Sequence, residues 1–178
     1  MIPYFELHRV FLGPVPIQVW GFFVALGILA GTVLSIRLAK QRHQDAALFW
    51  DLAFWVILSA FFFARLFHVV LYEPGYFLAN PWQAVAFWDG GASIVGGLFG
   101  AFVAAVWYLR HQQVDVWAHV DTGIFGLPLG LFIGRIGCFL IHDHPGTATD
   151  FILGVRYPDG VVRHDLGLYE SLNGLALL

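Results

Sequence analysis

The chain has 178 residues, of which 59% are apolar and only 12% are charged, with a net charge of -3. Soluble domains carry about 25% charged residues, so the composition excludes a water-soluble monomer, and its high hydrophobicity excludes a disordered chain. Nine Lys and Arg form no basic surface for nucleic acid, and one cysteine excludes both a disulfide framework and a multi-cysteine zinc site. The sequence predicts an integral membrane protein.

Four stretches are long and apolar enough to cross a bilayer as helices, which takes about 20 residues. In chain order they cover residues 15–36, 46–72, 91–109 and 120–141. A fifth apolar run, 168–178, ends inside what reads as another span, so we expect the native protein to continue. The predicted fold is an all-α, polytopic transmembrane bundle that forms one domain over residues 1–178.

The loop charges predict the orientation of these spans, because Lys and Arg collect in cytoplasmic loops. The cytoplasmic charges would be Arg37, Lys40, Arg42 and Arg110. Residues 73–89, between the second and third spans, contain no Lys or Arg. We therefore expect the N-terminus, the loop 73–89 and the segment 142–167 to lie outside.

Glycines recur every three or four residues in the fourth predicted span, which places them on one face of a helix. They are Gly123, Gly126, Gly130, Gly134 and Gly137, with shorter pairs at Gly27 and Gly31 and at Gly96 and Gly100. Close helix packing explains such a face. A groove for a lipid chain is the alternative explanation.

Arg135 is the leading functional candidate because it lies deep in the fourth predicted span. A charge near the bilayer centre costs about 2.5–3.5 kcal/mol on insertion scales. The planar guanidinium suits phosphate oxygens and stays charged in a low dielectric, so we expect it to bind phosphate. The alternative is an internal ion pair that serves packing.

Arg65, near the outer end of the second span, is open to a structural or a functional explanation.

Two polar clusters follow the fourth span in the expected outer segment. They are His142-Asp143-His144 and Arg163-His164-Asp165, the second followed by Tyr169-Glu170. Three interpretations stay open here: a solvated loop, general acid or base groups, and a metal site. No histidine and glutamate at helical spacing support the metal site, and the sequence therefore predicts none.

Several motifs resemble those of bacterial prolipoprotein diacylglyceryl transferases. Residues 88–100, which read W-D-G-G-A-S-I-V-G-G-L-F-G, are similar to the family's W-D-G-G-M-S-F-H-G-G-L-I-G. Residues 134–139 resemble the opening of its signature, G-R-x-G-N-F, and the segment 163–170 resembles its R-H-P-x-Q-L-Y-E. The motifs follow one another in the family's order over most of the chain.

The resemblance implies an enzyme of the bacterial inner membrane whose N-terminus lies outside. Such an enzyme moves the diacylglyceryl group of phosphatidylglycerol onto the lipobox cysteine of a prolipoprotein signal peptide, among membrane lipids and without metal or cofactor. The resemblance also implies that Arg135 binds the phosphate of the lipid. Asp143 stands where the family has a glutamate, and Tyr169 and Glu170 match directly.

Some positions depart from the family's pattern. The histidine of its H-G-G segment is Val95 here, its two asparagines are Cys138 and Ile141, and a tyrosine is Trp20. Either a histidine of the 142–144 cluster supplies the base, or the chain is an inactive, lipid-binding or structural subunit of a larger membrane complex. A metal-dependent hydrolase using that cluster is a third hypothesis.

The candidate residues follow from the residue chemistry and the resemblance together. The predicted catalytic residues are Arg135, His142, Asp143, His144, Tyr169 and Glu170. The predicted phospholipid-binding residues are Arg135 again with Ser93, Gly96, Gly97, Gly134, Gly137, Arg163 and His164.

Overall fold

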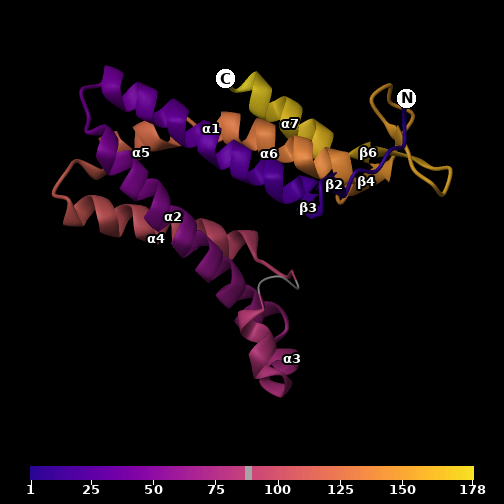
Figure 1. The fold of residues 1–178 in the computed structure, drawn as a ribbon, viewed down its shortest axis with the longest axis horizontal. Coiled ribbons are helices and arrows are strands. Elements are labelled where there is room, and N and C mark those ends of the chain that lie inside the picture. The colour runs from indigo at the N-terminus through magenta and orange to yellow at the C-terminus, as the bar shows by residue number, and fades with distance from the viewer. Residues whose placement is uncertain (87–89) are drawn as a thin grey trace. The chain divides into compact units, whose positions relative to one another are not determined.

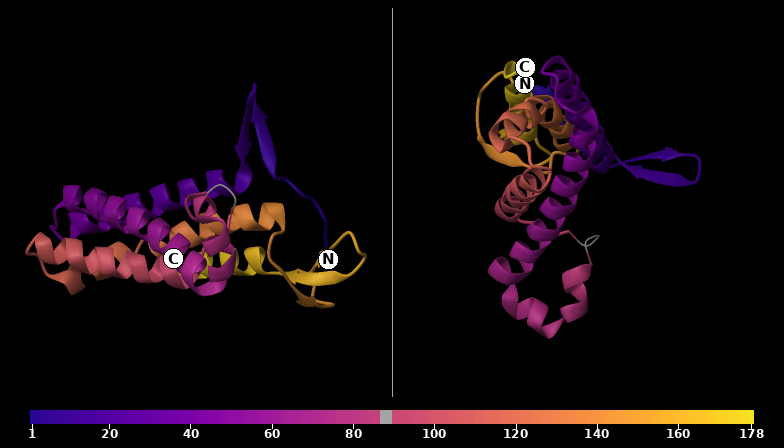
Figure 2. Two further views of the ribbon diagram at one scale, coloured as in Figure 1. Left: turned by 90° about the horizontal axis from the view of Figure 1, so that it is seen from below. Right: turned by 90° about the vertical axis from the view of Figure 1, so that its left-hand side faces the viewer.

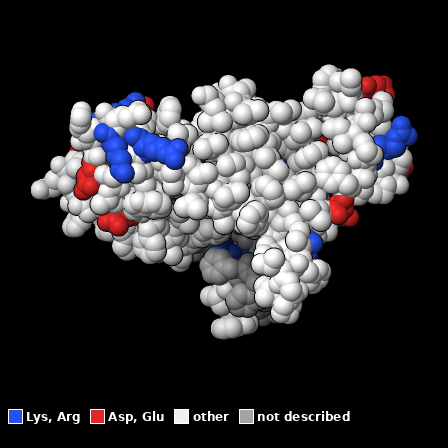
Figure 3. Space-filling view, turned by 45° about the horizontal axis from the view of Figure 1, so that its top comes forward, with Lys and Arg blue, Asp and Glu red and all other residues white. Residues whose placement is uncertain are grey.

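The computed structural model describes residues 1–86 and 90–178 and divides the chain into two compact units (Figure 1). Unit 1 comprises Met1–Arg37 and Gly123–Leu178, and unit 2 comprises Leu38–Thr122. Within the described residues, the helical segments that are long and apolar enough to cross a membrane are Val19–Gln41, Ala46–Tyr72, Ile94–His111 and Val116–Ile141. The predicted polytopic helical fold is thereby confirmed. On the face drawn in Figure 3 charged side chains are few, as a lipid environment requires.

Helix α1 (Val19–Gln41) and helix α6 (Leu127–Ile141) approach each other closely in unit 1. A Cβ atom added at Gly27 would lie 2.6 Å from the carbonyl oxygen of Gly130, and one at Gly31 would lie 2.7 Å from that of Gly126. Only glycine permits this approach of two backbones. The packing explanation therefore holds for these four glycines.

The predicted span 120–141 is two helices rather than one. Helix α5 (Val116–Ile124) ends before Gly126, and α6 begins with a proline, Pro128, in its first turn. Proline fits there because it has no N–H group to pair. The Ser35 hydroxyl donates to the Gly123 carbonyl at 2.8 Å and accepts from the Gly126 N–H at 3.1 Å, which satisfies backbone groups released by the break.

The first predicted span begins too early, because residues 15–18 form a strand. Strand β2 (Arg9–Leu12) pairs antiparallel with β3 (Val15–Gln18), and α1 begins only at Val19. Gly13, between the strands, has a φ of 64°, which glycine adopts without strain. The hairpin projects away from the helices of unit 1 (Figure 2).

A second sheet in unit 1 is absent from the sequence prediction. Its strand order is β1-β5-β6-β4, with β1 and β5 parallel and the other pairs antiparallel. The strands are β1 (Ile2–Pro3), β4 (Pro145–Ala148), β5 (Val155–Arg156) and β6 (Val162–Asp165). They are too short for an alternating pattern to be legible in the sequence.

Helix α7 (Leu166–Ala176) follows β6 directly and packs on α6. A Cβ atom at Gly167 would lie 2.7 Å from the Phe139 nitrogen, and one at Gly174 would lie 2.8 Å from the Phe132 nitrogen. The predicted fifth run, 168–178, thus belongs to a helix that starts two residues earlier. Its start is fixed by Asp165, whose carboxylate accepts from the Leu168 N–H at 3.0 Å.

Unit 2 is built on α2 (Ala46–Phe67) and α4 (Ile94–His111). A π-helical turn, His68–Tyr72, extends α2 to the predicted end of the second span. The third predicted span, 91–109, is displaced, since α4 begins at Ile94. Shorter elements between these helices are α3 (Pro74–Ala79) and a 3-10 turn, Pro81–Val85.

Two features of unit 2 explain why the segment before α4 is not helical. Gly90 and Gly91 have φ angles of 80° and 77°, and Ser93 caps α4 by accepting from the Gly96 N–H at 3.3 Å. The Arg65 guanidinium, with only 6% of the residue exposed, donates to the backbone carbonyls of this segment. Its acceptors are Gln83, Ala84, Ala86, Gly90 and Gly91. These contacts support the structural explanation of Arg65.

Candidate active site

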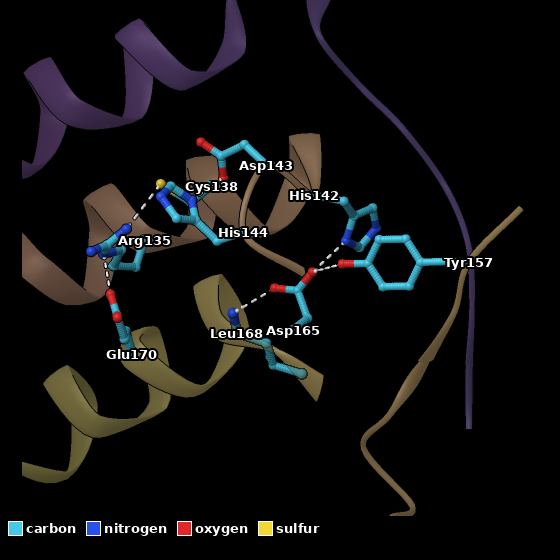
Figure 4. Close-up of polar contacts among 9 residues, drawn as sticks. All are labelled: Arg135, Cys138, His142, Asp143, His144, Tyr157, Asp165, Leu168 and Glu170. Atoms are coloured by element: carbon cyan, nitrogen blue, oxygen red, sulfur yellow. Dashed lines mark hydrogen bonds and ion pairs between the residues drawn. The ribbon is translucent and has the colours of Figure 1, made fainter. Parts of the chain in front are cut away.

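Arg135 projects from α6 toward α7, where it meets Glu170 (Figure 4). Its Nε lies 2.5 Å from the Glu170 Oε2, and the side chains are 24% and 49% exposed. An ion pair was the alternative to phosphate binding, and the structure contains it. About a quarter of the Arg135 side chain is therefore accessible from outside although it is paired with Glu170.

Cys138 lies one helical turn beyond Arg135 and is buried. The Arg135 Nη1 donates to its Sγ at 3.6 Å. The thiol therefore belongs to the same polar cluster as Arg135. Cys138 is not among the catalytic residues that the sequence predicts.

Asp143 and His144 follow α6 and complete this cluster. The His144 Nδ1 lies 2.6 Å from the Asp143 Oδ1, and the two side chains are 48% and 31% exposed, respectively. One donor atom each from Cys138, Asp143 and His144 lies within 4.8 Å of the others. Sulfur, oxygen and imidazole nitrogen are together able to hold a metal ion. They are equally able to move a proton.

His142 is placed very differently from its neighbour His144. It is the left-handed residue that ends α6, with a φ of 50°, and its side chain is fully buried. Its Nδ1 lies 2.6 Å from the Asp165 Oδ2, and its ring packs among aromatic residues. These are Tyr4, Phe5, Phe139 and Tyr157. The His142 side chain is therefore closed to solvent, and its predicted catalytic role stays a prediction.

Asp165 links three elements and was missed as a site residue. Its Oδ2 also accepts from the Tyr157 hydroxyl at 3.0 Å, while its Oδ1 caps α7. Burial and the Asp165 carboxylate both raise the pKa of Tyr157 above its ordinary value. An aspartate just before an apolar run is a helix-start signal, so the capping role could have been predicted.

Arg163 and His164 each contact one nearby polar side chain, Asp159 and Tyr169 respectively. Arg163 Nη2 lies 2.7 Å from the Asp159 Oδ2, and this guanidinium lowers the pKa of the Asp159 carboxyl. The His164 Nδ1 lies 2.7 Å from the Tyr169 hydroxyl. The predicted lipid-binding role of Arg163 and His164, and the catalytic role of Tyr169, stay predictions.

The predicted lipid-binding glycines have different surroundings. A Cβ atom at Gly137 would lie 2.8 Å from the Phe23 Cβ, so this position serves the packing of α1 on α6. A Cβ atom at Gly134 would have no heavy atom within 4 Å. Gly96, Gly97 and Ser93 belong to unit 2, where Gly96 faces Phe67 of α2. Trp88 and Asp89 of the resemblance motif lie outside the described residues.

The helices and this polar cluster define a class: a polytopic membrane protein with ionisable groups at one end of a helix pair. Comparison with known proteins gives the family. The family model for prolipoprotein diacylglyceryl transferase matches residues 8–178. The chain belongs to the prolipoprotein diacylglyceryl transferase family.

Three relatives named phosphatidylglycerol–prolipoprotein diacylglyceryl transferase illustrate the similarity. The Synechococcus elongatus protein is 35% identical over 175 residues, which cover 93% of this chain and 60% of the relative. The Bacillus cereus protein is 31% identical over 182 residues, covering 96% and 67%. The Nitrosomonas europaea protein is 33% identical over 181 residues, covering 98% and 65%. The chain thus spans about two thirds of the length of these relatives.

Proposed function

We propose that the protein containing this chain transfers the diacylglyceryl group of phosphatidylglycerol to the cysteine of a prolipoprotein. The reaction would take place at the outer face of the bacterial inner membrane, with the N-terminus on that side. The observation that carries the proposal is the accessible Arg135–Glu170 pair beside Cys138 and the Asp143–His144 pair. The names of the relatives support the two substrates.

Arg135 binds the phosphate of the lipid in this proposal. Guanidinium-to-phosphate hydrogen bonds are charge-assisted and about twice as strong as neutral ones. Glu170 holds the guanidinium in place before the lipid arrives and then shares it with the phosphate or gives it up. The same positive charge stabilises the phosphate that leaves during the reaction.

The acceptor thiol must lose a proton before it can attack. A cysteine has an ordinary pKa of about 8.5, so only a few per cent is thiolate at pH 7. Val95 has no group that accepts a proton, and His142 is fully buried. His144 is the half-exposed histidine next to Arg135's cluster, and Asp143 holds its Nδ1. We therefore propose His144, oriented by Asp143, as the group that receives the proton.

The transfer forms one bond at a glyceryl carbon of the lipid and breaks another. The thiolate forms a carbon–sulfur bond with the glyceryl carbon that carries the phosphate. The bond between that carbon and the phosphate oxygen breaks, and its electron pair stays on the phosphate beside Arg135. Glycerol phosphate leaves, and the thiol proton passes from His144 to solvent.

The test uses the full-length protein with phosphatidylglycerol and a lipobox peptide, followed by the mass gain of the peptide. We expect transfer by the wild type and a loss of about 100-fold or more in His144→Ala, the lower end of what a general base supplies. His111→Ala, at the exposed end of α4, is the control and should transfer normally. No transfer by the wild type, or transfer only by Val95→His, would contradict the proposal and favour a lipid-binding subunit.

A further inference from the structure

His142 and Asp165 form a buried pair that the proposed reaction does not use. Their side chains are 0% and 1% exposed, and the His142 Nδ1 lies 2.6 Å from the Asp165 Oδ2 (Figure 4). The His142 Nε2 has no hydrogen-bond partner within residues 1–86 and 90–178. His142 also has a φ of 50°, which strains most residues other than glycine. An unpaired buried nitrogen and a strained backbone both cost free energy, and such costs concentrate where they serve a function.

The pair ties the end of α6 to the start of α7. His142 is the residue that ends α6, and Asp165 is the N-cap of α7. The Asp165 Oδ1 accepts from the Leu168 N–H at 3.0 Å, and the Tyr157 hydroxyl donates to the Asp165 Oδ2, also at 3.0 Å. One buried carboxylate thus fixes where α7 begins relative to α6.

The start of α7 determines where Glu170 lies. Gly167 and Gly174 of α7 contact positions progressively earlier in α6, so α7 runs back along α6. Glu170 lies in the second turn of α7, and Arg135 lies about two turns before the end of α6. The Arg135 Nε and the Glu170 Oε2 are 2.5 Å apart. A shift of α7 by one residue, about 1.5 Å along its axis, would separate these two atoms.

The Arg135–Glu170 pair depends on this support because it is not buried. The two side chains are 24% and 49% exposed, and the attraction within an exposed ion pair holds its side chains only weakly. A guanidinium that is held in place before the lipid arrives loses less side-chain freedom when it binds. The position of α7 therefore influences the affinity of Arg135 for a phosphate.

We propose that His142 and Asp165 are positioning residues, which set α7 on α6 so that Glu170 holds the Arg135 guanidinium in the orientation that binds the lipid phosphate. The inference rests on the proposed function, which assigns the phosphate to Arg135. It gives His142 a role that needs no access to a substrate, in accordance with its complete burial. The motif R-H-P-x-Q-L-Y-E has proline where this chain has Asp165, so the pair is not part of the motif that the chain resembles.

The experiment titrates phosphatidylglycerol into the purified full-length protein in detergent, and it determines both the Kd and the number of binding sites per chain. His142→Gly removes the imidazole but keeps the left-handed end of α6, because glycine adopts a positive φ without strain. Asp165→Ser keeps a good N-cap but has no second oxygen for His142. We expect the Kd to rise at least ~5-fold in each variant, a part of the ~100-fold loss that a displacement of about 1 Å can cause.

The matched control is His43→Gly. His43 is an exposed histidine that follows α1 and has a φ of 56°, so this variant makes the same substitution in the same backbone conformation. It should bind the lipid with the Kd of the wild type. A variant that is only less stable would have fewer binding sites per chain at an unchanged Kd. An unchanged Kd in His142→Gly or in Asp165→Ser would therefore overturn the inference.

Glu170→Ala tests whether the effect passes through Glu170, because it removes the group that the pair positions. Arg135 keeps its charge in this variant, so lipid binding remains measurable. Residues that act through one another have non-additive effects, and His142→Gly should therefore change the Kd by less than ~2-fold when Glu170 is already alanine. An equal rise of the Kd in both backgrounds would overturn the route through Glu170.

The lipid titration and the peptide assay separate this inference from the proposed function. A wild type that binds the lipid but transfers nothing would count against the transferase function, and the Kd values would still decide the positioning role. Transfer by the wild type together with an unchanged Kd in His142→Gly would overturn the positioning role alone. A wild type that does not bind phosphatidylglycerol would overturn both.

Discussion

The guanidinium of Arg135 contacts two different groups, and both contacts depend on its shape. Nε faces Glu170, while Nη1 faces the Cys138 sulfur. A lysine could keep the charge but has a single donor centre without the planar fork. The residue type at this position, rather than its charge alone, should therefore decide phosphate binding.

Arg135→Lys should weaken the binding of phosphatidylglycerol at least ~10-fold, about 1.4 kcal/mol. Binding would be measured by titrating the lipid into the purified full-length protein in detergent. Arg37→Lys, an exposed arginine of α1, serves as the control and should bind the lipid as the wild type does. Wild-type lipid binding by both Arg135→Lys and Arg135→Ala would show that Arg135 is purely structural.

Tyr157 gives a prediction about pH. Burial and the Asp165 carboxylate raise the pKa of its phenol, so the folded state favours the neutral form. The contribution of Tyr157 to stability is therefore complete below the ordinary pKa of about 10 and is lost as pH rises through the raised value.

We accordingly expect Tyr157 to stay neutral in the folded protein at pH values where exposed tyrosines ionise. The measurement is the tyrosinate absorbance during an alkaline titration, with the wild type compared to Tyr157→Phe. The difference between them should appear only well above pH ~10. A difference that titrates with the exposed tyrosines would mean that the hydrogen bond to Asp165 does not form.

At the scale of elements, backbone contact between α1 and α6 organises unit 1. Gly27 of α1 faces the Gly130 carbonyl, which belongs to a helix and cannot turn aside as a side chain could. By contrast, Gly21 of the same helix has no heavy atom within 4 Å of an added Cβ. The two glycines therefore share a helix but differ in what surrounds them.

Gly27→Ala should destabilise the protein by about 1–3 kcal/mol, because the added methyl forces the helices apart. Gly21→Ala should be neutral or stabilising by up to ~1 kcal/mol, since alanine is the better helix former. Thermal unfolding of both variants in the same detergent gives the comparison. Equal melting temperatures for the two variants would refute the close approach of α1 and α6.

At the scale of the whole molecule, the spans confirm a membrane protein but leave its orientation as a proposal. Single cysteines at Gln41 and Pro74, in a Cys138→Ser background, would be probed in intact cells with a membrane-impermeant thiol reagent. Both positions are exposed in the structure. We expect labelling at Pro74 and none at Gln41, and the opposite pattern would reverse the topology.

The predicted site residues are divided between the two compact units. Arg135, Asp143, His144 and Glu170 all belong to unit 1, whereas Ser93, Gly96 and Gly97 belong to unit 2. The ion pair and the imidazole–carboxylate pair are thus complete within one unit. That residues 1–178 act as a single transmembrane domain, with unit 2 contributing to lipid binding, stays a prediction.

The sequence by itself determined the membrane class and the number of long spans, and it singled out Arg135 as a candidate, because hydropathy and an isolated charge are local properties of the chain. Only the tertiary structure distinguished the buried His142 from the half-exposed His144. Burial depends on strands and aromatic rings that are distant in sequence but surround the side chain in the fold. It also placed Cys138 and Glu170 against the Arg135 guanidinium, and Asp143 and His144 beside the Cys138 thiol. Their convergence depends on how α6 ends and how α7 packs back on it, and neither feature is encoded in local periodicity.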